Sequence, residues 1–422
     1  MRRRVAIVGY GSAGQCAAVL LSRDGHEVHV FERVPVPGPV GAGFLLQPSG
    51  LQVLWRMGLL AEVLRHGAPV ERLYGDARCG RAVMDMRYAA LDPRLAGIGL
   101  QRGALFSILA GAWDGHAAIR AGVRIAVIDS ERGLLQDDSG ARHGPFDVVV
   151  VADGAASRLR GDIGRVRLDR PYPWGALWCL LPRGDWTHGR ELRQRYVAAR
   201  KMIGLLPVGT RAGDDTPMLS FFWSLPASGF DRWARQGLDA WKDEVLALWP
   251  GIAPVIDAIR TPEQLARASY RDAVLSRWHR GRAVLVGDAA HSMSPQLGQG
   301  VNMALMDAMA LADALRGESG LDAALARFQR ERRRHVAIYQ RWSRWLTPMF
   351  QSDRDLVAKL RDVALLPMGR FPPGRTHMLR VLSGTQQGLF GQLALDRAFV
   401  EAFAEAIEGL QRQAGDDRSG VP

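Results

Sequence analysis

The segment Gly9-Tyr10-Gly11-Ser12-Ala13-Gly14 has the residue types and spacing that hold a pyrophosphate. The first glycine permits a tight turn, the second lets the backbone approach the phosphates, and the third allows a helix to pack on a strand. Glu32 lies 23 positions after Gly9, where an acidic side chain would bond ribose hydroxyl groups. Because an acid there disfavours a 2′-phosphate, this pattern predicts a site for FAD or NAD rather than NADP.

Two further segments turn this prediction toward a flavin. Residues 148–158 read as a buried strand that breaks into an Asp-Gly turn and then supplies a serine and an arginine. Residues 281–291 read as a strand that delivers Asp288, and the glycine-containing loop 295–302 follows it before a long helix. His291, next to this aspartate, is predicted to order the loop rather than to act as a base.

In this order along the chain, the three motifs resemble those of the single-component FAD-dependent aromatic hydroxylases. These are the p-hydroxybenzoate hydroxylase-like monooxygenases, which include the ubiquinone-pathway hydroxylases. The resemblance covers roughly residues 4 to 345. It implies that the Asp-Gly motif serves the pyrophosphate, that the Gly-Asp motif holds the ribityl chain, and that loop 295–302 borders the flavin ring. The cofactor-binding residues that it implies, or that the glycine motif predicts, are Gly9, Gly11, Ser12, Ala13, Gly14, Glu32, Arg33, Arg102, Asp153, Arg158, Gly287, Asp288, Gly298, Gln299, Gly300, Val301 and Asn302.

The resemblance also implies the reaction. NAD(P)H would bind transiently, and O2 would form a C4a-hydroperoxide on the reduced flavin that hydroxylates an aromatic or other electron-rich, lipophilic substrate. Pro295, Gly298 and Gly300 are the loop residues expected at the reacting ring, and Tyr196 is the candidate base. A flavin-dependent reductase of isoprenoid-type substrates is the alternative enzyme, and it would show no substrate-stimulated O2 uptake.

The elements that must position these motifs follow from hydrophobic patterning and predict an α/β fold. Short apolar runs at 5–8, 28–31, 146–152 and 283–286 are typical of buried parallel strands in a Rossmann-like FAD-binding domain. Residues 170–226 alternate and are rich in aromatic side chains, which predicts an inserted mixed or antiparallel sheet that binds substrate. We expect a discontinuous FAD-binding domain (1–72, 98–168 and 268–316), a substrate domain (73–97 and 169–267) and a C-terminal helical region (317–422).

Aromatic side chains of the inserted sheet are the candidates for the substrate pocket. Because successive side chains of a strand point to opposite faces, only about half of them are expected to contact substrate. They are Tyr172, Trp174, Trp178, Tyr196, Phe221 and Trp223.

Composition limits the function classes. The 422 residues are 47% hydrophobic and 23% charged, as in an ordinary globular protein, and no apolar stretch is long enough to span a bilayer. The net charge of +12 invites a nucleic-acid-binding or membrane-binding alternative. However, nearly every cation is arginine, which favours a general compositional bias, and we expect no nucleic-acid partner.

The three cysteines are widely spaced and predict neither a disulfide framework nor a metal site, so we expect a cytoplasmic protein. We expect it to be a monomer or a homodimer. One stretch, 327–344, concentrates arginines among aromatic residues. A basic helix with tryptophans is typical of membrane surfaces, and we hypothesise peripheral membrane contact through 327–350.

Overall fold

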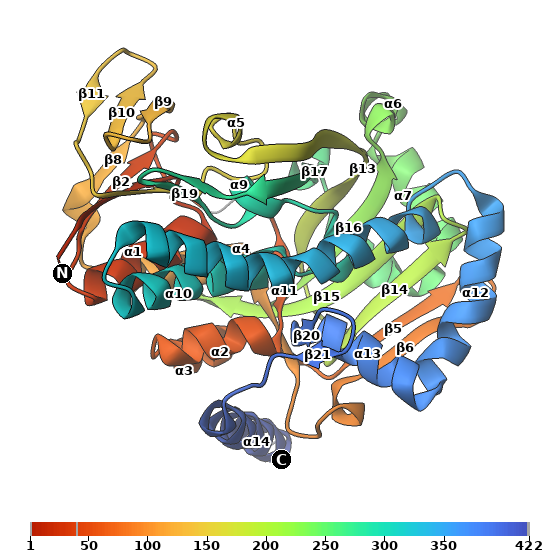
Figure 1. Cartoon of the computed structure of the whole chain (residues 1–422). Helices are drawn as coiled ribbons and strands as arrows, with labels where there is room; N and C mark the ends of the chain where they lie inside the picture. Colours follow the sequence, from red (N-terminus) through yellow and green to blue (C-terminus); the bar gives the residue numbers. More distant parts are fainter. Residues whose placement is uncertain (1, 39–40, 420–422) are drawn as a thin grey trace.

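The first motif lies within a six-stranded sheet in a computed structural model that describes residues 2–38 and 41–419. Five neighbouring strands run parallel, and β18 is added antiparallel at one edge (Figure 1). In spatial order the strands are β18 (His279–Arg280), β19 (Ala283–Leu285), β12 (Val148–Val151), β1 (Arg4–Val8), β2 (Glu27–Glu32) and β8 (Ile119–Ala121). The middle strands β19, β12 and β1 carry the three motifs at their carboxyl ends, which therefore meet at one edge of the sheet.

The helices α1 (Ser12–Arg23) and α10 (Gly300–Gly317) pack against each other beside this sheet. Both begin at glycine-containing loops, and both bury most of their residues because small and apolar side chains fill them. Each helix therefore directs its N-terminal backbone N–H groups toward the sheet edge at which the motifs meet.

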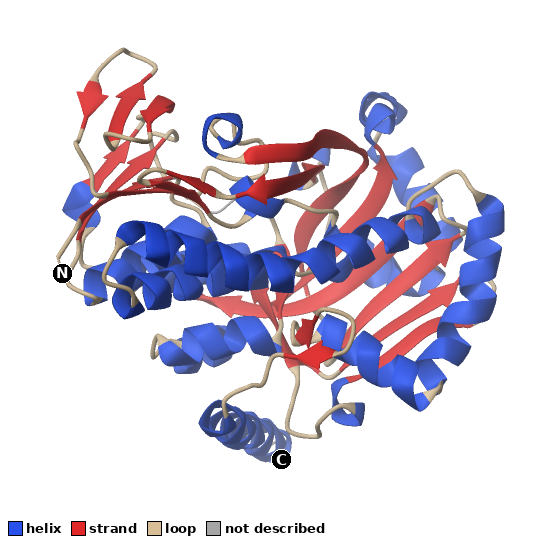
Figure 2. Cartoon of the chain, viewed as in Figure 1, coloured by secondary structure: helices blue, strands red, loops and turns tan. Residues whose placement is uncertain are grey.

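A second sheet has seven strands, whose neighbours are paired antiparallel except at the parallel β14–β5 pair (Figure 2). This confirms the predicted mixed sheet. Its strands, in spatial order, are β17 (Ala266–Arg277), β13 (Arg165–Pro182), β16 (Asp214–Pro226), β15 (Lys201–Arg211), β14 (Glu191–Val197), β5 (Arg72–Ala77) and β6 (Ala82–Arg87). One face is covered by α6 (Phe230–Gln236), α7 (Leu238–Leu248) and α8 (Ala253–Ile256).

Prolines lie within one long strand of this sheet. Pro171 and Pro173 both lie inside β13, which is 18 residues long. The pairing of β13 with β17 shifts its register between Pro171 and Gly175. A proline cannot donate a hydrogen bond to the neighbouring strand, so an irregular ladder is where the sheet tolerates it.

The remaining elements are short and lie around the two large sheets. Residues 48–66 form two helices rather than one, because Gly58 adopts a positive φ of 73° between them. The remaining strands are β3 (Gly43–Leu46), β4 (Ala68–Val70), β7 (Gly97–Gln101), β9 (Ile125–Asp129), β10 (Leu134–Asp137), β11 (Arg142–His143), β20 (Gln386–Gln387) and β21 (Gly391–Gln392). The helices among them are α2 (Pro48–Arg56), α3 (Leu60–His66), α4 (Arg102–Gly111), α5 (Arg160–Ile163) and α9 (Asp288–His291).

The C-terminal helices are α11 (Leu321–Phe350), α12 (Asp355–Arg370), α13 (Pro372–Leu382) and α14 (Arg397–Ser419). In Figure 1, α11 crosses the face of the molecule toward the seven-stranded sheet, and α12 then turns down beside β6. No helix among the described residues is long and apolar enough to cross a membrane. The division of the chain into domains stays a proposal, which the two separate sheets support.

Candidate functional site

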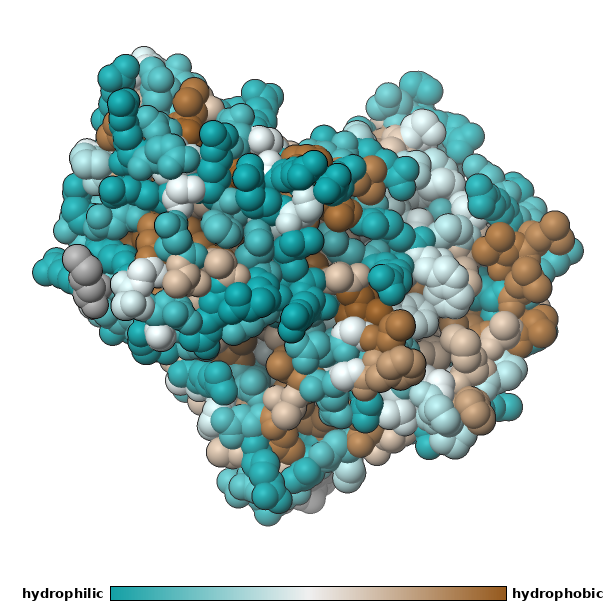
Figure 3. All heavy atoms as spheres, in the orientation of Figure 1, coloured by the Kyte–Doolittle hydropathy of each residue, from teal (hydrophilic) through white to brown (hydrophobic). Residues whose placement is uncertain are grey.

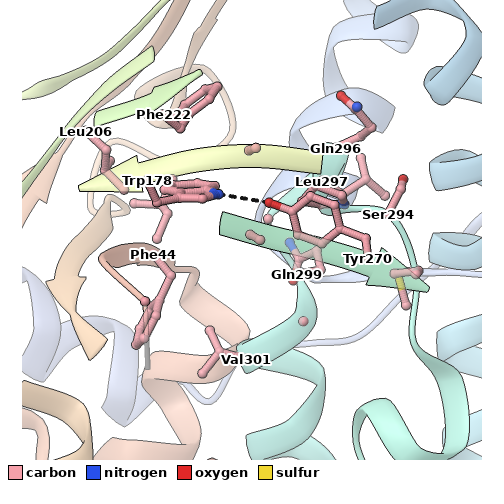
Figure 4. Close-up of a pocket in the computed structure, with 18 of the residues that line it drawn as sticks. Phe44, Trp178, Leu206, Phe222, Tyr270, Ser294, Gln296, Leu297, Gln299 and Val301 are labelled. Carbon is pink, nitrogen blue, oxygen red and sulfur yellow. Dashed lines mark hydrogen bonds between the residues drawn. The ribbon is translucent and has the colours of Figure 1, made fainter. Parts of the chain in front are cut away.

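A cavity of about 720 Å³ runs from the glycine motif to the C-terminal helices. At one end it is lined by Gly11, Ser12 and Ala13, and at the other by residues of β5, β6, β14, α12 and α13. Figure 4 shows its middle, where side chains of the loop after α9 face Trp178 and Tyr270. The cavity therefore joins the three cofactor motifs to the face of the second sheet that α6, α7 and α8 leave uncovered.

The glycine motif has the close contacts that its sequence predicts. A Cβ added to Gly14 would overlap the Gly9 carbonyl oxygen, and Gly9 itself has a φ of 103°. Gly11 is different, because an added Cβ would meet no atom within 4 Å. Glu32 accepts hydrogen bonds from the backbone N–H groups of Tyr10 (2.7 Å) and Val34 (2.9 Å), so its carboxylate also fixes this loop.

Arg160, rather than the predicted Arg158, joins the Asp-Gly and Gly-Asp motifs. Arg158 is exposed and Arg33 is exposed, whereas Arg160 is buried. The Arg160 Nη2 atom donates to the carbonyl oxygens of Ala155 (2.6 Å) and Asp288 (3.2 Å). The assignment of Arg158 is therefore corrected, because two positions along a tight turn decide which arginine points inward.

The loop between α9 and α10 is fastened on both sides. The Asn302 amide accepts from the Gln47 backbone N–H at 2.8 Å and donates to the carbonyl oxygens of Leu45 and Gly298. Gln299 Nε2 donates to the Leu382 carbonyl oxygen at 2.6 Å, which ties the loop to α13. Pro295, Gly298, Gln299, Gly300 and Val301 line the cavity, whereas Asn302 is fully buried beneath them and holds the loop in place.

A buried cluster of charged and titratable side chains lies next to this loop. It consists of Asp307, His291, Arg332 and His335. Asp307 accepts from His291 Nε2 and Arg332 Nε, each at 2.6 Å, and from the Gly287 backbone N–H at 2.7 Å. Burial raises the pKa of Asp307, but His291 and Arg332 outweigh it and lower that pKa to about 2. His291 does not line the cavity, so the structure supports its predicted role in ordering the loop.

His335 makes this cluster sensitive to acid. Its Nε2 atom lies 2.9 Å from the Gly384 carbonyl oxygen and its Nδ1 atom 2.8 Å from Arg332 Nη1, so the ring fits as the neutral Nε2–H tautomer. Burial and the neighbouring Arg332 charge lower the pKa of His335 to about 3. Between about pH 6.5 and pH 3 the unfolded chain binds a proton here that the folded chain does not, so stability falls as the pH falls.

We expect this group to remove about 2 kcal/mol of unfolding free energy between pH 7 and pH 5. The measurement is urea unfolding at both pH values, for the wild type and for His335→Gln. The neutral glutamine keeps an amide near Gly384 but binds no proton, so the variant is expected to lose about that much less stability across the same interval. Equal pH dependence in the two proteins would contradict the assignment.

The predicted aromatic residues lie on both faces of the second sheet, because successive side chains of a strand point to opposite faces. Trp178 and Tyr196 line the cavity. Phe221 and Trp223 lie on the opposite face, where both rings contact Trp241 of α7 edge to face. Their neighbour Phe222 faces the cavity instead. The prediction for Phe221 and Trp223 is therefore wrong by one position along the strand, and Tyr172 and Trp174 are buried outside the cavity lining.

Tyr196 is in the cavity but does not have the environment of a base. Its hydroxyl group donates to Gln194 Oε1 at 2.8 Å, and burial raises the pKa of this phenol above its ordinary value. A base at neutral pH needs a lowered pKa and a free lone pair facing substrate, so the structure corrects this candidate.

Several cavity residues carry no sequence signal that points to them. Tyr270 on β17 projects its ring into the cavity, and its hydroxyl oxygen accepts from Trp178 Nε1 at 2.9 Å (Figure 4). Leu365, Met368 and Met378 line the far end from α12 and α13. Only the alternation of β17 could have indicated Tyr270, whereas the contribution of the C-terminal helices depends on how the chain returns to the second sheet.

The residues present fit FAD. Room is left beside Gly11, and the buried atoms Gln296 Nε2 and Gln299 Oε1 have no hydrogen-bond partner in the described part of the chain. Arg102 lines the cavity beside Phe44, and among the described residues no carboxylate lies within salt-bridge distance of its guanidinium. An open backbone cradle, unpaired polar atoms and a free cation are what a dinucleotide with a pyrophosphate requires.

This combination of a parallel sheet, a glycine cradle and a loop between the cradle and a second sheet defines the class of flavin-dependent oxidoreductases. The family model described as FAD binding domain matches residues 2–343, and the chain belongs to this family. It is an FAD-dependent monooxygenase.

Similar proteins agree with this class. The FAD-dependent urate hydroxylase of Klebsiella pneumoniae is 27% identical over 343 residues, which are 78% of this chain and 85% of that protein. A Rhodococcus erythropolis protein described as a 2-heptyl-3-hydroxy-4(1H)-quinolone synthase is 29% identical over 390 residues, 91% of this chain and 97% of that protein. The structure of 2-methyl-3-hydroxypyridine-5-carboxylic acid oxygenase superposes with a TM-score of 0.74 at 23% identity, covering 90% of this chain and 97% of that chain, and shows that the fold is shared.

Proposed function

We propose that this monooxygenase hydroxylates a lipophilic aromatic substrate in the cavity between loop 295–301 and the second sheet. The balanced reaction converts an aromatic C–H bond, O2, NAD(P)H and a proton to a C–OH bond, water and NAD(P)+. The observation that carries the proposal is the continuity of one cavity from the dinucleotide cradle to an aromatic-lined chamber. Relatives named for the hydroxylation of urate and for the synthesis of a heptyl-hydroxyquinolone support an aromatic ring at this place.

Bound FAD would supply the redox chemistry with NAD(P)H and O2. The protein would orient the cofactor and the substrate and exclude water from the site. Arg102, Asp288 and the cradle at Gly11 would hold the cofactor. The Gly298 N–H donates to the Pro295 carbonyl oxygen, whereas α10 begins at Gly300, so the positive end of this helix is available to an anionic ring edge. Trp178 and Phe222 would close the substrate side and keep water out.

The test is NAD(P)H oxidation by the FAD-loaded enzyme against phenols, prenylated quinone precursors and polyketides, with O2 uptake and product mass recorded. Substrate-stimulated O2 uptake and a product heavier by one oxygen atom are expected. Reduction of a substrate double bond without O2 uptake would instead establish the isoprenoid-reductase alternative.

Tyr270→Phe is expected to lower kcat/KM for the accepted substrate by about tenfold. The Tyr270 hydroxyl already accepts from Trp178, so its proton is free to donate into the cavity. Burial raises the pKa of Tyr270, which keeps this donor protonated at neutral pH. Losing one such hydrogen bond is worth about 1 to 1.5 kcal/mol, or roughly tenfold. Tyr172→Phe removes a buried hydroxyl outside the cavity lining and should leave kcat/KM nearly unchanged.

We also propose peripheral contact of 327–350 with anionic membrane. Arg332 is buried against Asp307, and Arg344 bonds Asp272, so not all of the predicted basic cluster is free. Arg330, Arg333, Arg334 and Arg341 remain exposed along α11. Apolar side chains of Leu356, Leu360 and Val363 lie exposed on α12. A hydrophobic patch is visible at the right of Figure 3, on the side where Figure 1 places α12.

Flotation with liposomes containing phosphatidylserine should carry the protein at low salt and release it at high salt. A variant in which Arg330, Arg333 and Arg334 are changed to glutamine should not float with the liposomes at low salt. Absence of low-salt binding by the wild type would end this proposal.

A further inference from the structure

The far end of the cavity differs in chemistry from the cofactor end. Among the described residues, four charged side chains line the cavity. They come from the start of α4, from β17 and from the start of α9, and they are Arg102, Arg267, Arg271 and Asp288. The lining supplied by β5, β6, β14, α12 and α13 contains no charged side chain in the described part of the chain. The far end is therefore electrically neutral.

The cations nearest to this end are already engaged. Arg271 is bound by the Asp169 carboxylate, and Arg267 stacks over the rings of Phe230 and Trp233. Arg361 is buried beneath the chamber, but its guanidinium donates to Asp362 Oδ1 at 2.6 Å and to the Met349 carbonyl oxygen at 2.8 Å. A substrate carboxylate placed here would be buried without a counter-charge, which is strongly unfavourable.

Methionine side chains dominate the same end. Their flexible thioethers come from two strands of the second sheet and from two C-terminal helices, and adapt to apolar groups of varied shape. They are Met84 and Met86 on β6, Met202 on β15, Met368 on α12 and Met378 on α13. Both helices lie after the part of the chain that the family model matches, whereas β6 and β15 lie within it.

Neutral donors are also present at this end. Gln194 uses its Oε1 atom to accept from Tyr196, and within the described part of the chain its amide N–H groups have only a 3.8 Å contact to the Met202 sulfur. Ser224 accepts from the Met202 backbone N–H at 2.8 Å, and its own proton has no acceptor among the described residues. Such donors suit a neutral carbonyl or hydroxyl oxygen rather than a charged group.

We infer that the chamber selects an uncharged aromatic substrate carrying an apolar substituent, which lies against the methionine wall of β6, α12 and α13. The inference rests on the proposed hydroxylation for the placement of the aromatic ring. A substituent there exchanges water for the apolar wall, and each buried methylene group is expected to tighten binding by about threefold.

The test measures binding to the FAD-loaded enzyme by flavin absorbance and equilibrium dialysis, and product formation in parallel. The probes are phenol, para-butylphenol, para-heptylphenol and the heptylphenol analogue whose chain ends in a carboxylate. We expect Kd to fall along the first three, and the terminal carboxylate to weaken binding by at least roughly tenfold. Equal binding of the neutral and carboxylated chains, or no effect of chain length, would overturn the inference.

Met84→Lys should reverse the preference, because it places a cation on the half-buried β6 wall. Binding of the carboxylated probe should improve about tenfold while that of para-heptylphenol weakens. Met368→Lys makes the same change from α12 if the first variant does not fold. Met218→Lys on β16, outside the cavity lining, is the matched control and should change neither Kd. Binding that depends on the length of the alkyl substituent, without any hydroxylated product, would refute the proposed function and leave this selectivity standing. Hydroxylation that does not depend on the alkyl substituent would support the proposed function and refute the selectivity.

Discussion

A Gly11→Ala variant is expected to fold as the wild type does and to bind FAD at least roughly tenfold more weakly. No protein atom lies within 4 Å of an added Cβ at Gly11, and its φ of −79° suits any residue, so the fold has no reason to resist alanine. The added methyl group would occupy the cradle in which the pyrophosphate approaches the backbone, and such a clash is worth about 1 to 3 kcal/mol. Flavin content after purification and FAD titration of the stripped protein measure the loss.

Gly14→Ala is the matched contrast three positions along the chain. Its Cβ would overlap the Gly9 carbonyl oxygen, so the turn itself must shift. We expect thermal unfolding of the FAD-free protein to show the damage in Gly14→Ala and not in Gly11→Ala. If Gly11→Ala retains FAD like the wild type, the cofactor does not approach this part of the loop and the cradle is misassigned.

The second large effect is expected at Asp307, where Asp307→Ala should lower the free energy of unfolding by about 3 to 5 kcal/mol. The substitution leaves the buried Arg332 guanidinium and the His291 ring without their acceptor, and also frees the Gly287 N–H. Because Gly287 immediately precedes Asp288, the flavin content should fall together with stability. Urea unfolding, followed by far-UV circular dichroism, measures the first effect.

Asp313→Ala provides the comparison on the same helix. Asp313 pairs with Arg316 at 2.8 Å, but both side chains are substantially exposed, so water replaces the lost partner. An exposed pair contributes about 0 to 1 kcal/mol, and this variant should be nearly as stable as the wild type. If the two aspartate variants lose similar free energy of unfolding, the Asp307 cluster does not stabilise the folded protein to the extent that its burial indicates.

The cofactor half of the site was largely predictable because its signals are local. Gly9, Gly11 and Gly14 specify a turn through contacts within a few residues, and Asp288 follows its strand directly. The error at Arg158 has the same origin, since residues 158 and 160 both follow the turn and only the folded backbone shows that Arg160 points inward.

The substrate half was predictable in composition but not in orientation. The sequence shows that 219–223 is an alternating apolar strand, yet Phe221 and Phe222 differ only in which face of the sheet each occupies. Helices α6 to α8 cover one face and enclose Phe221 and Trp223, which leaves Phe222 to the cavity. That choice depends on contacts between segments far apart in the chain, which periodicity alone does not contain.

By itself, the sequence determined the class of protein, because a strand, a glycine turn and a helix are specified by neighbouring residues and bring their own phosphate-binding geometry. Only the tertiary structure decided the shape and neutrality of the substrate chamber. Its far wall joins β6, near the start of the chain, to Met368 and Met378 near the end, and such a wall exists only once the chain has closed on itself. The tertiary structure likewise decided that Asp307, Arg332 and His335 form one buried cluster, since burial sets their charges and depends on every segment packed around them.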